Sequence, residues 1–246
     1  MANPPRVYVD VDLSDGAVVE LPDAVHRHLV VVLRRIRGDT VTLFNSRGGE
    51  YTAELETLGK KTATARITGF HDISRESRLS VMLAQAVSKG DRMDYCLQKA
   101  VELGVTAIQP LVTDHVAVRL SEERWERKRE HWQGIVVAAA EQSGRTAVPQ
   151  VAPVLDLRDW LNHVPADALR LVLEPTAAHA VVKYHGQPVR LLAGPEGGLS
   201  EQELRLADLA GFTALALGPR TLRTETAAVT ALSVLQARWG DLGSAL

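Results

Sequence analysis

Gly194-Pro195-Glu196-Gly197-Gly198 is a glycine-rich turn that follows the apolar run Val189–Ala193. A second glycine turn, Leu217-Gly218-Pro219-Arg220, follows the apolar run Thr213–Leu217 and precedes a helical pattern. Each stretch predicts a strand, a tight turn and then a helix, because glycine permits a sharp bend and lets a ligand approach the main chain. Two such turns at the ends of parallel strands can line one crevice, where an open α/β sheet usually binds its ligand. The two turns therefore predict a parallel sheet and a binding site at its edge.

The C-terminal half around these turns alternates strand patterns with helix patterns. Hydrophobic periodicity predicts further strands at Leu79–Ala86, Val105–Val112 and Arg170–Leu173, and helices at Arg92–Leu103, Glu122–Gln142 and Glu225–Trp239. Gly104 is a predicted helix stop, and Ser200 with Glu203 predicts a capping box at the start of another helix. Strands that alternate with helices predict an α/β domain whose parallel sheet is covered on both faces.

The first 73 residues have a different, β-rich pattern. Turn signals and β-branched residues predict short strands at Val7–Val9, Thr40–Phe44 and Thr62–Thr68. One short helix is predicted at Asp23–Arg35. Short strands at this spacing predict a small barrel, and the polar stretch His71–Arg78 is the predicted linker. The sequence thus predicts two domains, residues 1–73 and residues 79–246.

Composition and charge set the outer limits on function. The 246 residues are 46% hydrophobic and 24% charged, which is typical of a soluble globular protein. The sequence shows no signal peptide and no uncharged stretch of transmembrane length. The single cysteine, Cys96, fits a reducing compartment. We therefore expect a cytoplasmic protein with no membrane partner. Cys96 itself is predicted to lie in the core. A formal net charge of −2 does not indicate a nucleic-acid binder, but it leaves room for a local basic patch. No metal site is predicted, since His26 and His28 have no third ligand at a matching spacing.

The charges of the two turns narrow the class of ligand. Neither phosphate-binding glycine fingerprint is present. Glu196 puts a carboxylate inside the first turn, which would repel a triphosphate but suits a neutral or cationic ligand. The second turn places Arg220, Arg223 and Glu225 within six residues beside a helix start, which is more charge than a plain turn needs. The alternative is that both are ordinary helix-entry loops.

Together the two turns resemble a known signature. Gly-Pro-Glu-Gly-Gly followed by Leu-Gly-x-Arg-x-Leu-Arg-x-Glu-Thr-Ala is similar to the signature of the trefoil-knotted SPOUT methyltransferases. More narrowly, it resembles that of the bacterial 16S ribosomal RNA uridine N3-methyltransferases (the RsmE family). Other segments resemble the same family in order along nearly the whole chain: His26–Leu29, Val32–Arg34, Gly38-Asp39, Lys89–Asp94, Gln98–Val105 and Ala140–Arg145.

This resemblance implies a fold, a reaction and partners. The fold is a small PUA-like β-barrel that helps to hold RNA, followed by a SPOUT α/β domain whose chain end threads through a loop. The reaction is methylation of N3 of a specific uridine in 16S ribosomal RNA, with S-adenosyl-L-methionine as the methyl donor. The partners are 16S ribosomal RNA or the small ribosomal subunit, and a second copy of the chain, because similar proteins are homodimers with the active site at the subunit interface.

The resemblance also maps the methyl donor onto three loops. The implied donor-binding residues are Leu173, Glu174, Pro175, Ala193, Gly194, Pro195, Glu196, Gly197, Gly198, Leu217, Gly218, Leu222, Arg223, Thr224, Thr226 and Ala227. A bent donor held by backbone amides and carbonyls would explain the glycines. For Pro175, Leu217 and Leu222 the alternative is ordinary packing.

The acceptor sets a separate chemical requirement. Uridine N3 is a weakly acidic imide, so its methylation needs a general base, or a cation that stabilises the developing uridinate. The candidates in matching motifs are Glu141, Arg145, Arg220, Arg223 and Glu225. For Arg223 with Glu225, a structural ion pair that locks the loop is weighted equally with a catalytic role. The sequence does not single out the base.

RNA contact is expected from dispersed basic residues. The candidates are Arg6, Arg27, Arg34, Arg35, Arg37, Lys89 and Arg92, with Lys99 beside them. Arg34-Arg35-x-Arg37 is the best patch, although any one of these side chains taken alone is better explained as a solvated charge. The chain departs from the family pattern at His115, where an arginine is expected, and at Leu199, where an aromatic is common. The first departure, with the neighbouring Arg119, bears on RNA contact.

Two other functions remain open from the sequence. One is a SPOUT enzyme that methylates a different RNA atom or a ribose. The other is an RNA-binding assembly factor that has kept the fold without catalysis, which Glu196, Arg223 and Glu225 argue against.

Overall fold

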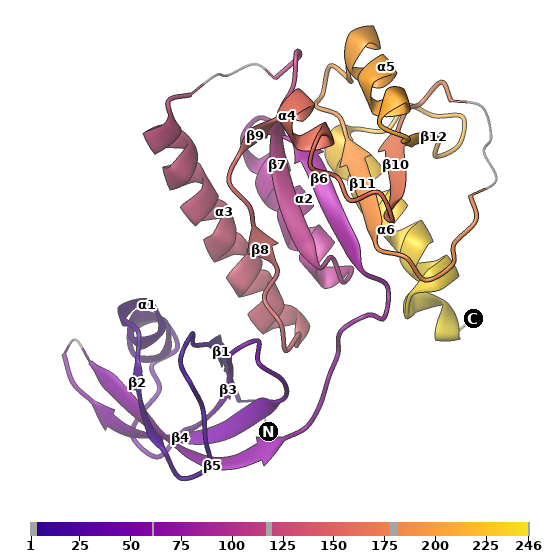
Figure 1. Ribbon diagram of the computed structural model, residues 1–246. Coiled ribbons are helices and arrows are strands. Elements are labelled where there is room, and N and C mark those ends of the chain that lie inside the picture. The colour runs from indigo at the N-terminus through magenta and orange to yellow at the C-terminus, as the bar shows by residue number, and fades with distance from the viewer. Residues whose placement is uncertain (1–3, 61, 117–119, 178–181, 246) are drawn as a thin grey trace. The chain divides into compact units, whose positions relative to one another are not determined.

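Two β-sheets, each with its own core, organise the chain (Figure 1). The computed structural model describes residues 4–60, 62–116, 120–177 and 182–245. Unit 1 consists of Met1–Glu76 with Ala140–Val148, and unit 2 consists of Ser77–Ala139 with Pro149–Leu246.

Unit 1 is a curled five-stranded sheet. Its strands are β1 (Arg6–Tyr8), β2 (Val18–Leu21), β3 (Thr40–Phe44), β4 (Glu50–Leu58) and β5 (Ala63–His71), in the order β1-β3-β4-β5-β2. All neighbours are antiparallel except β1 and β3. Two register shifts between β4 and β5 act as bulges, and bulges bend a sheet and increase its twist. Leu43, Leu55 and Ile67 are buried inside this curl.

The helix of unit 1 is shorter and less regular than the sequence predicts. The predicted span Asp23–Arg35 contains one α-helical turn, α1 (Asp23–His26), followed by a π-helical segment, Arg27–Val32. Arg34 has a φ of +53°, a left-handed conformation that a right-handed helix cannot contain, so the helix ends before it. The predicted helix is therefore too long by about one turn at its C-terminal end.

Unit 2 is built on a parallel sheet, as the sequence predicts. Its strands are β6 (Val81–Ala86), β7 (Ala107–Val112), β8 (Gln150–Val151), β9 (Leu155–Asp156), β10 (Leu169–Leu173), β11 (Val189–Ala193) and β12 (Thr213–Leu215). The order is β12-β10-β11-β6-β7-β8, with β9 also paired to β7, and every pairing is parallel.

The helices of unit 2 cover this sheet. They are α2 (Asp91–Glu102), α3 (Glu122–Ser143, whose last residues belong to unit 1), α4 (Leu157–Leu161), α5 (Glu201–Leu209), α6 (Thr224–Trp239) and the 3-10 turn η2 (Leu242–Ala245). Helices α4 and α5 pack on Ala84, Leu111, Val172 and Leu192 of the sheet. Helix α6 contacts both α2 and β11. The described helices include none that is long and apolar enough to cross a membrane.

Local signals in the sequence set the ends of these elements. Helix α2 ends just before Gly104, whose φ is +76°, as the predicted helix stop requires. The predicted capping box at the start of α5 is present, because Ser200 Oγ accepts a hydrogen bond from Glu203 N and the Glu203 carboxylate accepts one from Ser200 N. Strands β8 and β9 and helix α4 were not predicted, since elements of two to five residues are too short to show a period.

The parallel arrangement brings three loops to one edge of the sheet. Strands β10 and β11 are neighbours, and β12 pairs with β10 on the other side. Their carboxyl ends therefore lie at the same edge. The segments that leave these ends begin at Glu174, at Gly194 and at Ala216. The last of them leads into α6.

Candidate functional site

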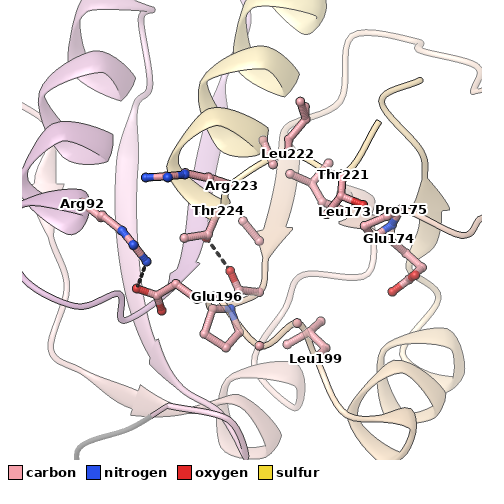
Figure 2. A pocket seen from close by; sticks show the side chains of 16 residues that line it. Arg92, Leu173, Glu174, Pro175, Glu196, Leu199, Thr221, Leu222, Arg223 and Thr224 are labelled. Carbon is pink, nitrogen blue, oxygen red and sulfur yellow. Dashed lines mark hydrogen bonds and ion pairs between the residues drawn. The ribbon is translucent and has the colours of Figure 1, made fainter. Parts of the chain in front are cut away.

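A cavity of about 520 Å³ lies at this edge of the sheet (Figure 2). Its walls come from the end of β10 and the loop after it, the loop after β11, the segment that enters α6, and α2, which contributes Arg92. A smaller cavity of about 30 Å³ shares Leu173, Glu174, Pro175, Leu222 and Ala227 with the first and extends toward Leu217, Gly218 and Arg220. The main volume lies within the ~300–1,000 Å³ that small-molecule sites occupy.

The glycines of the first turn shape this cavity with their backbone. A Cβ on Gly194 would lie 3.1 Å from Leu199 N, and a Cβ on Gly197 would lie 3.1 Å from His115 Cβ. Gly198 has a φ of +72°, a conformation that side-chain-bearing residues rarely adopt. A side chain at position 194 or 197 would require its neighbour to move by a few tenths of an ångström, and one at 198 would strain the backbone, so glycine suits all three positions. The turn therefore presents main-chain groups to the cavity.

Glu196 is the anionic group of the first turn. Its Oε1 accepts hydrogen bonds from Lys89 N and from Arg92 Nη1, each at 3.0 Å, and Figure 2 shows the one from Arg92. Partial burial raises the pKa of Glu196, but these hydrogen bonds and the charge of Arg92 outweigh it, so the pKa is lowered overall. Glu196 is therefore a carboxylate at neutral pH, and Arg92 holds it from the side of α2.

Arg223 and Arg220 present unpaired cations beside the cavities. Both side chains are exposed, and neither has an ion pair or hydrogen-bond partner within the described ranges. Arg223 is the N-cap residue of α6, yet its side chain makes no capping hydrogen bond. Figure 2 shows Arg223 on the side of the cavity where Arg92 lies. The structural ion pair between Arg223 and Glu225, which the sequence left open, does not occur among the described residues.

Glu225 is the second residue of the same helix and lies in its first turn. It lines neither cavity, and its Oε2 is buried without a hydrogen-bond partner in the part of the chain described. It lies near Cys96, which is buried as predicted: burial, and then the charge of Glu225, raise the pKa of the Cys96 thiol to about 12. Cys96 is therefore a neutral thiol rather than a nucleophile.

Two further acceptor-site candidates, Glu141 and Arg145, lie in unit 1. Burial raises the pKa of Glu141, although its carboxylate accepts a hydrogen bond from Tyr8 N at 2.9 Å. Arg145 is buried and forms an ion pair with Glu76, whose Oε1 also accepts the amide of Thr146. Both side chains thus hold local structure in unit 1, and their catalytic roles stay predictions.

The structure divides the predicted RNA-binding residues into free and engaged side chains. Arg27, Arg34, Arg37 and Lys89 are exposed. Arg35 lies 3.9 Å from Asp39, Arg6 forms an ion pair with Glu50 and lies over the Phe44 ring, and Lys99 pairs with Glu102. Arg92 lines the main cavity and forms an ion pair with Glu196. Its predicted role as a surface RNA contact gave no indication of this position.

The donor-binding residues named from the sequence converge with one exception. All of them line one of the two cavities except Thr226, which is exposed on the first turn of α6. The sequence did not identify Arg92, Leu199, Leu215 and Thr221 as lining residues. His115 lies against the glycine turn, with Nδ1 3.0 Å from Gly198 O, while Arg119 lies outside the described residues.

Comparison with known proteins gives a consistent result. A family model described as an RNA methyltransferase domain matches residues 75–236, and one described as an RNA methyltransferase PUA domain matches residues 21–68. The chain is 31% identical to ribosomal RNA small subunit methyltransferase E of Buchnera aphidicola over 97% of this chain and 98% of the relative.

Two of the solved structures that match cover 98% of this chain. One is ribosomal RNA small subunit methyltransferase E from Neisseria gonorrhoeae bound to S-adenosyl methionine, with 41% identity, 98% and 100% coverage and a TM-score of 0.91. The other is a putative methyltransferase from Legionella pneumophila in complex with the cofactor SAM, with 42% identity, the same coverage and a TM-score of 0.93.

Proposed function

This chain belongs to the ribosomal RNA small subunit methyltransferase E family, and from that premise we propose that it transfers a methyl group from S-adenosylmethionine to N3 of a specific uridine in 16S ribosomal RNA. The observation that carries the proposal is the main cavity, with its glycine backbone and its carboxylate at the edge of a parallel sheet. The two structural relatives, at 41% and 42% identity, were solved with this donor.

The lining of the cavity fits each part of the donor. The apolar side chains of Leu173, Pro175 and Leu222 suit the adenine ring, and the main chain of Gly194–Gly198 can hydrogen-bond the polar groups. Glu196 is a carboxylate that favours the cationic groups of the donor. When bound, S-adenosylmethionine supplies an electrophilic methyl group on a positively charged sulfur.

The acceptor site follows from the unpaired cations. An imide nitrogen becomes nucleophilic only when its proton leaves, and a guanidinium stabilises the negative charge that then develops. Arg223 is the candidate for this role, because it lines the main cavity and has no competing ion pair in the described part of the chain. Arg220, which lines the smaller cavity, is proposed to contact a neighbouring phosphate or base.

We further propose that the enzyme is a homodimer. From Thr226 to Ala237, α6 carries no charged residue, although Thr226 and Ala237 are exposed and Val234 is 43% exposed. The charged face that a surface helix usually turns to water is therefore missing from this stretch of α6. A second copy of this chain would cover that face next to the cavity. Light scattering that shows only monomers at micromolar concentration would contradict this.

The remaining parts of the proposal concern the RNA and the cell. We propose that residues 1–73 form a domain that helps to hold 16S ribosomal RNA or the small subunit through Arg27, Arg34 and Arg37, and that residues 79–246 form the catalytic domain. The family models, which match 21–68 and 75–236, support this division. The threaded knot and a cytoplasmic location stay predictions from the family resemblance.

Two measurements test the proposed function. Calorimetric titration of the purified chain with S-adenosylmethionine should give saturable binding, and the absence of binding would refute it as an enzyme of this class. Mass spectrometry of 16S ribosomal RNA from cells that lack the gene should show the loss of one methyl group from a uridine base, restored by this chain. A methyl group on a ribose or a carbon atom would refute the assignment to N3.

A further inference from the structure

Gln85 is a fully buried polar side chain beneath the main cavity. It is the penultimate residue of β6, and its exposed fraction is 0%. In the parallel register of β6 and β11 it pairs with Ala193, the residue directly before the glycine turn. Gln85 itself does not line the cavity.

The amide of Gln85 joins two loops that are far apart in the chain. Its Nε2 donates to Thr224 Oγ1 at 3.0 Å, lies 3.5 Å from Gly194 O, and also donates to Ala86 O. The Thr224 hydroxyl in turn donates to Gly194 O at 2.6 Å, the hydrogen bond drawn from Thr224 in Figure 2. Gln85, Gly194 and Thr224 therefore form a closed triangle of hydrogen bonds.

The carbonyl of the same amide reaches a third element. Gln85 Oε1 accepts a hydrogen bond from the neutral thiol of Cys96, which lies on α2. Every polar atom of the Gln85 side chain is thus satisfied, as a group without access to water requires. An apolar residue of the same length would fill the space but would leave Thr224 Oγ1 and Cys96 Sγ without these partners.

We infer that Gln85 is a positioning residue for the proposed donor site, because it fixes the Gly194 carbonyl and the first residue of α6 at one separation. The inference rests on the proposed function for the identity of the donor. Thr224 and Gly194 both line the cavity, so the contact between them joins two of its wall segments and fixes how they meet. Thr224 also follows Arg223 directly, so the same contact sets the starting point of the Arg223 side chain.

Gln109 provides a matched control. It is a buried glutamine with an exposed fraction of 5%, on the neighbouring strand β7, and its Nε2 donates to the carbonyls of Pro110 and Pro153. None of these partners lines either cavity. If a buried glutamine amide contributed only to the stability of the fold, Gln85→Met and Gln109→Met would have the same effect on donor affinity.

The test compares donor affinity with stability. We expect Gln85→Met to weaken S-adenosylmethionine binding by about tenfold, as the loss of one buried hydrogen bond implies, while Gln109→Met binds like wild type. Both variants should lower the Tm. Equal donor affinities for Gln85→Met and wild type would overturn the inference, and so would equal weakening in the Gln109→Met variant.

The Thr224 end of the same hydrogen bond gives a second route if Gln85→Met does not fold. Thr224→Ser keeps the hydroxyl and should retain donor affinity, whereas Thr224→Val should weaken it. In the double variant, Gln85→Met should weaken donor binding by much less than a further tenfold beyond Thr224→Val alone, because both changes remove the same hydrogen bond between Gln85 and Thr224. Fully additive effects, or a Thr224→Ser variant as weak as Thr224→Val, would overturn the inference.

Hydrogen exchange without the donor separates this inference from the proposed function. In Gln85→Met, but not in Gln109→Met, the amides of Gly197–Leu199 and of the first turn of α6 should exchange faster. If wild type failed to bind S-adenosylmethionine, the proposed function would fall, but a local increase in exchange would still support the positioning role. Unchanged exchange at both loops would contradict it.

Discussion

Replacing Arg223 by alanine tests the acceptor site most directly. The Arg223 side chain makes no capping hydrogen bond, and it is exposed. Its removal should therefore change the free energy of unfolding by less than about 0.5 kcal/mol, which for a chain of this size is a Tm shift of roughly 2 °C or less. Donor affinity should stay within about twofold, because the glycine turn and Glu196 are untouched.

Turnover should respond very differently. Loss of one charge-stabilising group at a reacting centre typically costs about 10²–10³ in kcat. We expect a loss of this order in single-turnover methylation of 16S ribosomal RNA, with partial recovery in Arg223→Lys, which keeps the charge but not the planar fork. Arg205→Ala is the matched control, since Arg205 is an exposed arginine on α5 that lines neither cavity. A fall in donor affinity by the same factor as kcat, or a fall in Tm well beyond the roughly 2 °C expected above, would refute the reasoning and favour a structural role.

Three further substitutions address the rest of the site. Glu196→Gln should weaken S-adenosylmethionine binding in calorimetry. Because the folded-state pKa of Glu196 is lowered, the carboxylate stabilises the fold above its ordinary pKa of 4.5, and this contribution is lost as the pH falls through the lowered value. Wild type and variant should therefore differ in Tm at neutral pH and converge in acid, and a Tm difference that is constant with pH would contradict this. His115→Ala removes the contact to Gly198 O and should raise the KM for the donor by several-fold with kcat nearly unchanged, whereas a selective loss of kcat would point to RNA contact instead. The double variant Arg34→Ala with Arg37→Ala should weaken RNA binding and flatten its salt dependence without changing donor affinity, and an unchanged salt slope in a filter-binding assay would exclude the patch.

Much of unit 2 could be predicted because its signals are local. The apolar run before Gly194 is a strand and the capping box at Ser200 begins a helix, as predicted, whereas the run predicted at Thr213–Leu217 is a strand only over Thr213–Leu215. Unit 1 was harder. The π-helical segment after α1 and the left-handed Arg34 break a pattern that otherwise indicates a regular helix, and nothing in the periodicity marks that break.

The candidate site shows the same limit at the level of side chains. The loops could be predicted from their glycines, whose role is a property of the backbone itself. The partners of Glu196 could not, because Arg92 lies 104 positions earlier in the chain and looked like any surface cation. Gln85 is a similar case: a polar residue within a strand indicates neither its burial nor its contact with Thr224. Such contacts depend on sheet order, which a single sequence does not state.

The span of chain that closes the main cavity has a consequence for the order of folding. The hydrogen bond from Gln85 to Thr224 joins residues 139 positions apart, so the cavity exists only after nearly all of unit 2 has assembled. Contacts of such long sequence separation make folding slow, and they form late. A ligand that needs the finished cavity stabilises the native state but not the transition state. Added donor should therefore slow the unfolding of unit 2 without speeding its folding, so a newly made chain has to complete its fold before the donor can protect it.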